Sequence, residues 1–294
     1  MGLRVKPTYR QRRFGAEVRK LRERAGLSVG ESAAVMGMQQ SHISSVEAGR
    51  TSLSEERLRR LAGRVSGVSS TYVDALLELG QRSGKGWWSV YRDRIRPSFL
   101  DIAELEAGAE RIVNYEPMFV PMLLQTEAYG TANFKGGYVR PSPERQELES
   151  EFRLRRQGVL HGEAPPRYHA IIHEAALHAR FGSREMMRDQ LLRLIEASRL
   201  PHVTIQVLPF DGAVPFGTPF NLIEPKVAEL GTVVVPHIEK SLYLGDVDSL
   251  DRYNRWFANL SEMALPPVDA EVRPEAHSAK DSLGLIQRLL YPLL

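Results

Sequence analysis

The chain has 294 residues, of which 43% are hydrophobic and 26% are charged, a balance typical of a globular protein with a substantial core. It contains no run of about 18 apolar residues and no apolar segment after a basic start, which argues against a membrane-spanning helix and a signal peptide. The absence of cysteine excludes disulfides, zinc–thiolate sites and cysteine nucleophiles, so we expect a cytoplasmic protein.

The net charge of +3 conceals two parts of opposite sign. Residues 1–90 contain 16 lysines and arginines against 8 acidic residues, whereas the remaining residues contain 23 against 28. A basic segment joined to a mildly acidic remainder is typical of a nucleic-acid-binding module attached to another domain. The length of the chain is sufficient for both.

The first expected element is a helix that starts at Arg12, because apolar residues recur at helical spacing up to Gly26. Residues 1–11, which hold scattered cations and no apolar period, are expected to form either a disordered terminus or a flexible basic arm that contacts DNA phosphate or the minor groove. Arg12 and Arg13 lie in the expected first turn, where the helix dipole disfavours cations, so phosphate is their predicted partner.

Two short helices joined by a tight turn are predicted within Leu27–Arg50. Ser28 and Glu31 have the spacing of a capping box at a helix start. Gly37 can supply the positive φ that a sharp turn between helices requires. The second helix is expected from about Gln39 to Ala48, and together these features indicate a helix-turn-helix. An ordinary helical hairpin of an all-α domain is the alternative interpretation.

The outward face of that second helix favours DNA binding, because it carries amide and hydroxyl side chains instead of the charged pairs of a solvated surface. Such side chains can donate to and accept from base edges in the major groove. The predicted base-contacting residues are Gln39, Gln40, Ser41, His42, Ser44 and Ser45. The predicted phosphate-contacting residues are Arg12, Arg13, Arg50 and Ser28.

Two more helices, around Leu58–Val65 and from Thr71 onward, would complete a five-helix domain over residues 12–82, followed by a polar linker at 83–86. This stretch resembles the phage-repressor (XRE-type) helix-turn-helix domain. The matching residues are Leu27, Ser28, Ala33, Gly37, Ser41, Ile43, Ser44, Val46, Glu47 and Gly49. The resemblance implies a transcriptional regulator.

Two positions depart from the XRE-type pattern. Val29 stands where the family usually has a glutamine that braces a phosphate, and Ser45 stands where an arginine is frequent. Both departures remove polar groups that would reach DNA. The expected compensation is contact from the basic arm or from a second subunit.

Residues 87–265 are predicted to form a larger mixed α/β domain, which makes the whole chain α+β. The predicted strands near its end are short and follow one another closely, which favours a small, largely antiparallel sheet. They lie at Val203–Val207, Phe220–Ile223, Thr232–Pro236 and Ser241–Leu244, after an earlier strand at Tyr168–His173. Residues 266–294 read as a proline-rich spacer and a helix near Ser278 that packs either on its own domain or on a second subunit.

The second part of the chain also resembles a known group. The segments that carry the resemblance are Tyr115–Tyr129, Glu151–Gln157, Val203–Phe210 and Ser241–Leu244. They are similar to actinobacterial XRE-type regulators with an uncharacterised, toxin–antitoxin-like C-terminal domain. The resemblance implies a regulator that is often encoded beside a small partner protein.

No enzymatic motif is evident. His173 and His178 are five residues apart, which places them on different sides of a helix, whereas a zinc-binding HExxH helix needs histidines four apart. No nucleophile elbow, phosphate-binding loop or dinucleotide glycine pattern occurs in the sequence. We therefore expect no catalytic residues, no metal and no cofactor, and an enzyme on a DNA-binding tether is the least favoured alternative.

The sequence thus predicts a homodimeric transcriptional regulator that binds a palindromic operator in double-stranded DNA and is controlled through residues 87–265. The controlling signal would be a small molecule or a small protein. The alternative is an antitoxin-like protein that sequesters a small partner and binds DNA to regulate itself. If a small-molecule pocket exists, the candidate aromatic residues are Trp88, Tyr115, Phe210, Phe216 and Tyr243.

Overall fold

The computed structural model describes residues 7–81, 85–135, 142–179, 182–211, 217–237, 240–271 and 280–294. Contacts divide the chain into two compact units. The first unit is Met1–Gly108 with Lys226–Leu230, and the second is Ala109–Pro225 with Gly231–Leu294. Among the described residues, no helix has the length and apolar character needed to cross a membrane.

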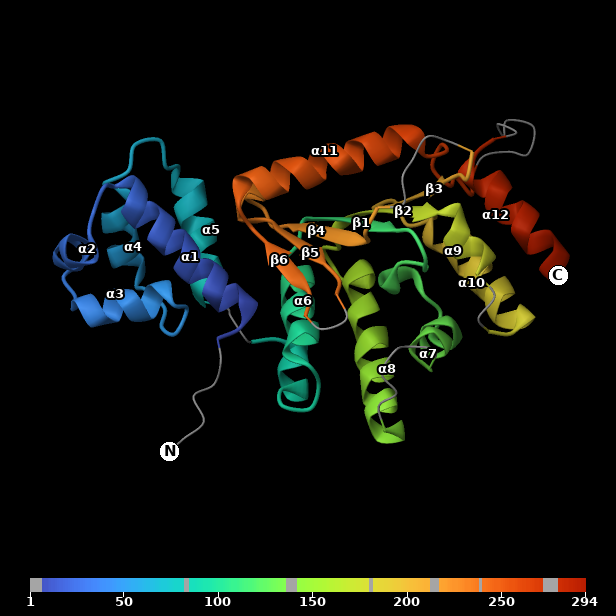
Figure 1. Ribbon diagram of the computed structural model, residues 1–294, viewed down its shortest axis with the longest axis horizontal. Coiled ribbons are helices and arrows are strands. Elements are labelled where there is room, and N and C mark those ends of the chain that lie inside the picture. Colours follow the sequence, from blue (N-terminus) through green and yellow to red (C-terminus); the bar gives the residue numbers. More distant parts are fainter. Residues whose placement is uncertain are drawn as a thin grey trace. The chain divides into compact units, whose positions relative to one another are not determined.

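The first unit begins with five helices, as the sequence predicts (blue to teal in Figure 1). They are α1 (Tyr9–Arg24), α2 (Val29–Met36), α3 (Gln40–Glu47), α4 (Glu55–Ala62) and α5 (Ser70–Gln81). One apolar core joins them, because each helix buries the residues on one face; Leu21, Ile43 and Leu58 are among the side chains with almost no exposure. A 3-10 turn, η1 (Trp87–Tyr91), and α6 (Pro97–Ala107) follow within the same unit.

Helix α1 begins at Tyr9, so the prediction of a flexible arm up to residue 11 is wrong for the part that is described. Thr8 and Gln11 form a capping box in which each side chain bonds to the backbone amide of the other. Arg10 lies inside this helix and donates to the carbonyls of Glu78 (2.7 Å) and Leu79 (2.9 Å) at the end of α5. Residues 1–6 of the predicted arm lie outside the described residues.

Two segments that the sequence assigned to the second domain belong to the first unit by their contacts. One is η1 with α6, where the Asp101 carboxylate accepts a bond from the amide of Tyr9 at the start of α1 (2.8 Å). The other is η4 (Ala228–Leu230), whose Leu230 is 3% exposed in the helical core. The Arg13 guanidinium donates to the carbonyl of Glu229 in the same segment (3.1 Å).

The second unit is built on a six-stranded mixed sheet in the order β3-β2-β1-β4-β5-β6. The strands are β1 (Arg111–Glu116), β2 (Arg167–His173), β3 (Val203–Leu208), β4 (Phe220–Glu224), β5 (Thr232–Val235) and β6 (Leu242–Leu244). The predicted antiparallel pairing is found from β4 through β5 to β6, and β1, a strand that the sequence did not indicate, also pairs antiparallel with β4. The pairs β1–β2 and β2–β3 are parallel, because helical crossovers separate these strands in the chain.

Helices cover both faces of this sheet, with α11 along one face and α8 and α10 on the other (Figure 1). The helices are α7 (Glu127–Lys135), α8 (Pro143–Gln157), α9 (Glu174–His178), α10 (Arg184–Ala197), α11 (Val247–Met263) and α12 (Ser282–Leu290), with 3-10 turns η2 (Met122–Leu124), η3 (Gly158–His161) and η6 (Tyr291–Leu293). Polar bonds also join α11 to the sheet, since the Glu224 carboxylate accepts from Asn254 (3.0 Å) and from Arg111 (2.6 Å).

The last helix, α12, packs on its own domain. Its Ser282 hydroxyl accepts a bond from the amide of Val207 in β3 (2.9 Å), and Leu283 and Ile286 are buried. The helix begins at Ser282, with Asp281 as its N-cap, and not near Ser278, which lies outside the described residues. Of the two alternatives open at the sequence level, packing within the chain is the one observed.

Candidate nucleic-acid interface

Helix α3 has one buried face and one exposed polar face. Ile43 and Val46 are each 1% exposed and anchor the helix in the core of the first unit. The opposite face points to solvent. Gln39, Gln40, Ser41, His42 and Ser44 are exposed, and Ser45 is half-buried. The structure therefore places all six predicted base-contacting residues along one short helix and its N-cap, and leaves five of them exposed.

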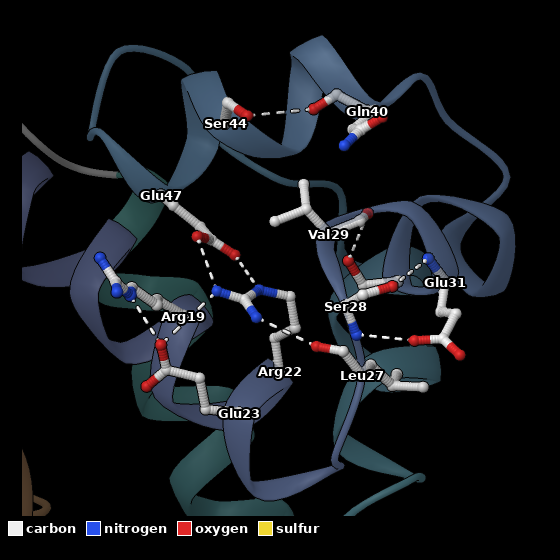
Figure 2. Close-up of polar contacts among 11 residues, drawn as sticks. Arg19, Arg22, Glu23, Leu27, Ser28, Val29, Glu31, Gln40, Ser44 and Glu47 are labelled. Carbon is white, nitrogen blue, oxygen red and sulfur yellow. Dashed lines mark hydrogen bonds and ion pairs between the residues drawn. The ribbon is translucent and has the colours of Figure 1, made fainter.

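Helix α2 and the turn after it follow the predicted local chemistry, and Figure 2 shows the capping box at the start of the helix. The Ser28 hydroxyl accepts from the amide of Glu31 (3.2 Å), and the Glu31 carboxylate accepts from the amide of Ser28 (2.8 Å), which confirms the capping box. These bonds hold the pKa of Glu31 below its usual range. Gly37 has a φ of 60°, and the amide of Met38 bonds to the carbonyl of Ala33 (3.0 Å), so a glycine closes the helix as predicted.

A buried ion pair holds α3 against α1 (Figure 2). The Arg22 guanidinium donates to both carboxylate oxygens of Glu47, at 2.6 and 3.2 Å, and also to the carbonyl of Leu27, at 3.0 Å. The bond to Glu47 raises the pKa of Arg22. One side chain thus links α1, the turn before α2 and the end of α3, which fixes the orientation of the exposed face.

Two glycines allow the backbones of α1 and α3 to approach closely. A Cβ at Gly15 would lie 2.5 Å from the carbonyl oxygen of Val46, and a Cβ at Gly49 would lie 2.7 Å from that of Gln11. Gly49 also has a φ of 70°, a conformation that other residues rarely adopt. The end of α3 is therefore pressed against α1 at a distance that only glycine permits.

The predicted phosphate-contacting residues fall into two classes. Arg50 and Ser28 are exposed beside α3 and α2, and Arg12 is exposed although it lies 3.7 Å from Asp101 and donates to the carbonyl of Pro7. Arg13, in contrast, is buried. It pairs with Glu17 one turn later on α1 (2.7 Å), because both side chains face inward, and this position does not suit the predicted phosphate contact.

The positive charge of Arg13 is paired inside the first unit with the buried carboxylate of Glu17. Glu17 also accepts from Lys20 (2.8 Å) and from the hydroxyl of Tyr72 on α5 (2.8 Å). Burial and the Glu17 charge raise the pKa of Tyr72. This cluster ties α1 to α5, so one of the basic residues that suggested DNA contact stabilises the unit internally.

Sequence reasoning missed the roles of Arg22 and Arg57. Arg57 on α4 donates to the carbonyl of Met36 (3.2 Å) and so braces the end of α2. The role of Arg22 could have been inferred from its position, because it lies beside Leu21 on the inward side of an amphipathic helix. A cation at an inward position needs an internal acceptor, and Glu47 of the helix-turn-helix pattern is the carboxylate that the structure supplies.

The candidate aromatic residues do not form one site. Trp88 is buried in the first unit, and Tyr115 is buried within the sheet of the second. Phe210 is 52% exposed against the rings of His173 and His178, Tyr243 is half-buried on β6, and Phe216 lies outside the described residues. A pocket of about 250 Å³ in the second unit is lined by α9, α10 and the C-terminal turn instead.

The histidines that resemble a metal motif have other bonding partners. His173 is the N-cap of α9, where its Nδ1 accepts from the amide of Ala175 (3.1 Å), and burial lowers its pKa. His178 lies 3.2 Å from the carboxylate of Glu174. In the ranges that the structure covers, no group of three or more histidine or acidic side chains is arranged to hold a metal ion.

Comparison with protein families divides the chain in a similar way. A helix-turn-helix domain model matches residues 13–79, and the model of a domain of unknown function, DUF5753, matches residues 99–288. The match to the first model implies that this region binds DNA. No curated protein and no solved structure matches the chain.

Proposed function

This chain belongs to the DUF5753 family, and we propose that it is a dimeric, sequence-specific transcriptional regulator whose α3 reads the major groove of an operator. The DUF5753 region would receive the controlling signal. The observation that carries the proposal is the exposed polar face of α3, held in a fixed orientation by the Arg22–Glu47 pair.

The chemistry of that face suits base recognition. The amides of Gln39 and Gln40 can each donate and accept, and glutamine can pair with the edge of an adenine through two bonds. Gln39 occupies the N-cap of α3 without a side-chain capping bond, so its amide is not used by the helix. The hydroxyl of Ser44 donates weakly to the carbonyl of Gln40 (3.3 Å) and keeps its acceptor capacity for a base.

Phosphate contacts would come from exposed groups around α3. Arg50 follows the end of α3, and Ser28 caps the start of α2, where backbone amides also favour an anion. Arg12 is a further exposed cation near the same end of α3, since the backbone of Gln11 and Arg12 contacts Gly49. Binding should therefore weaken steeply as salt concentration rises.

A dimer is proposed because one small helix-turn-helix unit presents a limited surface to DNA. Two copies related by a two-fold axis would read two half-sites about one helical turn apart, roughly 34–36 Å. Sedimentation of the full chain with and without operator DNA tests this part of the proposal. A complex of one chain per operator would contradict it.

The decisive test is selection of a preferred sequence from a random DNA library, followed by anisotropy titrations with the selected and a scrambled duplex. We expect Gln40→Ala combined with Ser44→Ala to lower the ratio of specific to non-specific affinity by at least about tenfold, since a bidentate base contact contributes about 1–3 kcal/mol. The matched control is Thr71→Ala combined with Gln81→Ala, two exposed polar residues of α5.

An unchanged specificity ratio in the α3 variant would contradict the assignment of α3 as the recognition helix. A second experiment distinguishes a regulator from an antitoxin-like partner protein. Purification of the full chain from its own cells with a small protein at fixed stoichiometry would favour the antitoxin-like alternative, whereas a free chain that responds to a small molecule would favour the regulator.

A further inference from the structure

The second unit contains a pocket of about 250 Å³ between α9, α10 and the C-terminal turn η6. Its walls are mostly apolar and come from four separate elements. They include Leu177 of α9, Met187 and Leu191 of α10, Leu289 of α12 and Leu293 of η6. An apolar pocket with a few polar groups at its mouth is the usual form of a small-molecule site.

The polar group that distinguishes this pocket is the guanidinium of Arg184. It donates to the carbonyl of Pro292, which leaves further N–H groups available. Among the described residues it forms no ion pair. The next residue in the chain, Glu185, bonds to its own amide and to Ser183, and these bonds, with smaller contributions from the charges of Arg188 and Arg184, lower its pKa. Within the described ranges, Arg184 therefore has no carboxylate at ion-pair distance.

The carboxylate of Glu174 near the pocket is held by two hydrogen-bonding partners. His178 lines the pocket, and its Nε2 lies 3.2 Å from the Glu174 carboxylate. The second oxygen of Glu174 accepts from the amide of Phe210 (2.9 Å). The start of α10, a helix of 14 residues, is also at the pocket and adds partial positive charge. The guanidinium of Arg184 and the start of α10 therefore both favour an anion at this side of the pocket.

We propose that this pocket binds a small apolar carboxylate, with the carboxylate on Arg184 and the apolar chain between α10 and η6. Its role as an effector site rests on the proposed DNA-binding function, but binding itself does not. A cavity of about 150 Å³ holds benzene, so about 250 Å³ has room for about ten non-hydrogen atoms. Octanoate has this size and serves as the probe.

The test is a ligand-observed NMR titration of the full chain with octanoate, below the concentration at which octanoate self-associates. We expect saturable binding at one site, with butyrate roughly 200-fold weaker because it buries four fewer methylene groups. Arg184→Gln should weaken octanoate about tenfold but leave octan-1-ol unchanged, because the alcohol has no charge to pair with a guanidinium. Arg288→Gln, at an exposed arginine of α12, is the matched control.

A second pair of variants tests the apolar part of the pocket. Leu289→Trp should narrow the pocket and weaken octanoate at least about tenfold. Leu289 is only half-buried, so the fold can accommodate the larger ring at that position. Gln287→Trp, on the exposed side of the same helix, should leave binding unchanged. The far-ultraviolet circular dichroism and thermal midpoint of each variant establish that it is folded.

Three outcomes would overturn the proposal: no saturable binding of octanoate, binding that Leu289→Trp leaves unchanged, or equal losses for octanoate and octan-1-ol in Arg184→Gln. Operator titrations with and without octanoate then address control. If the operator is bound but octanoate does not change its affinity, the pocket is not an effector site. If no DNA sequence is preferred, the proposed function fails while the NMR result for the pocket stands.

Discussion

Replacing Glu47 by glutamine isolates the ion pair that orients α3. In the native chain the Arg22 and Glu47 side chains are only 11% and 12% exposed, and two bonds of 2.6 and 3.2 Å join them. Glutamine has nearly the same shape but keeps one acceptor and turns an NH2 group toward the guanidinium. A bond to a charged group contributes about 1.5–3 kcal/mol, and breaking a buried pair costs about 3–5 kcal/mol.

The expected loss lies toward the lower of these ranges. The Arg22 guanidinium keeps its bond to the carbonyl of Leu27, and water can reach part of it. We therefore expect Glu47→Gln to lower the local stability of α3 by about 2 kcal/mol, which is roughly a 30-fold increase in the population of the opened helix. Amide hydrogen exchange of peptides that cover residues 40–47, measured by mass spectrometry, reports this change directly.

The control for this experiment is Arg19→Gln on the same helix. Arg19 pairs with Glu23 at 2.7 Å, but the two side chains are 62% and 50% exposed, so water can replace the pair (Figure 2). We expect no measurable change in the exchange of α3. If Glu47→Gln also leaves that exchange unchanged, or if Arg19→Gln accelerates it equally, the buried pair does not hold α3 in place.

Three further predictions concern charge, protonation and packing. Arg50→Gln should weaken specific and non-specific DNA binding alike and lower the slope of log K against log salt by about 1, as measured by anisotropy. Burial raises the pKa of Glu116 to about 8 from an ordinary value of 4.5, so the folded state keeps a proton that the unfolded chain loses. Stability of the second unit should therefore fall as pH rises from about 4.5 to about 8. Glu116→Gln should remove this fall and stabilise the unit by about 2 kcal/mol at pH 8. This free energy is smaller than the full pKa difference would give, because the side chain is partly exposed. Leu230→Ala should destabilise the first unit by about 2–4 kcal/mol through a core cavity, seen as faster exchange in α1.

Each of these predictions has a matched control. For the salt slope it is Arg199→Gln, an exposed arginine of the second unit, and an equal change in both variants would contradict a phosphate contact. For the pH profile it is Glu110→Gln at an exposed carboxyl just before β1. For the core cavity it is Leu242→Ala on β6, where the side chain is 52% exposed. A cavity variant that leaves α1 unaffected would show that the segment adds nothing to the helical core.

The elements that could be predicted from the sequence depend on local chemistry. The capping box of Ser28 and Glu31 and the glycine at Gly37 act within a few residues, so their spacing alone predicts the turn between α2 and α3. The antiparallel pairing of β4, β5 and β6 also follows from short connections. The start of α1 was readable too, since Thr8 and Gln11 have capping-box spacing, but the cations around them suggested an arm.

The features that could not be predicted depend on contacts between distant residues. Nothing local distinguishes Arg12, which is exposed, from Arg13, which is buried; the difference arises because Arg13 faces Glu17 and the core. The parallel pairing of β1 with β2 joins strands that are about fifty residues apart, so no turn sequence between them indicates that they pair. The pocket near Arg184 likewise exists only because α12 and η6 pack beside α10.

The presence of Leu230 in the helical core has a consequence for synthesis on the ribosome. Residues 7–108 leave the ribosome first, but the segment Lys226–Leu230 that completes their unit follows only after residues 109–225 have been translated. At roughly 5–20 residues per second, this interval lasts on the order of 10 s. During that time the nascent DNA-binding unit lacks an apolar side chain of its core. A nascent chain that is cut short before Leu230 would therefore release this unit with an exposed apolar site.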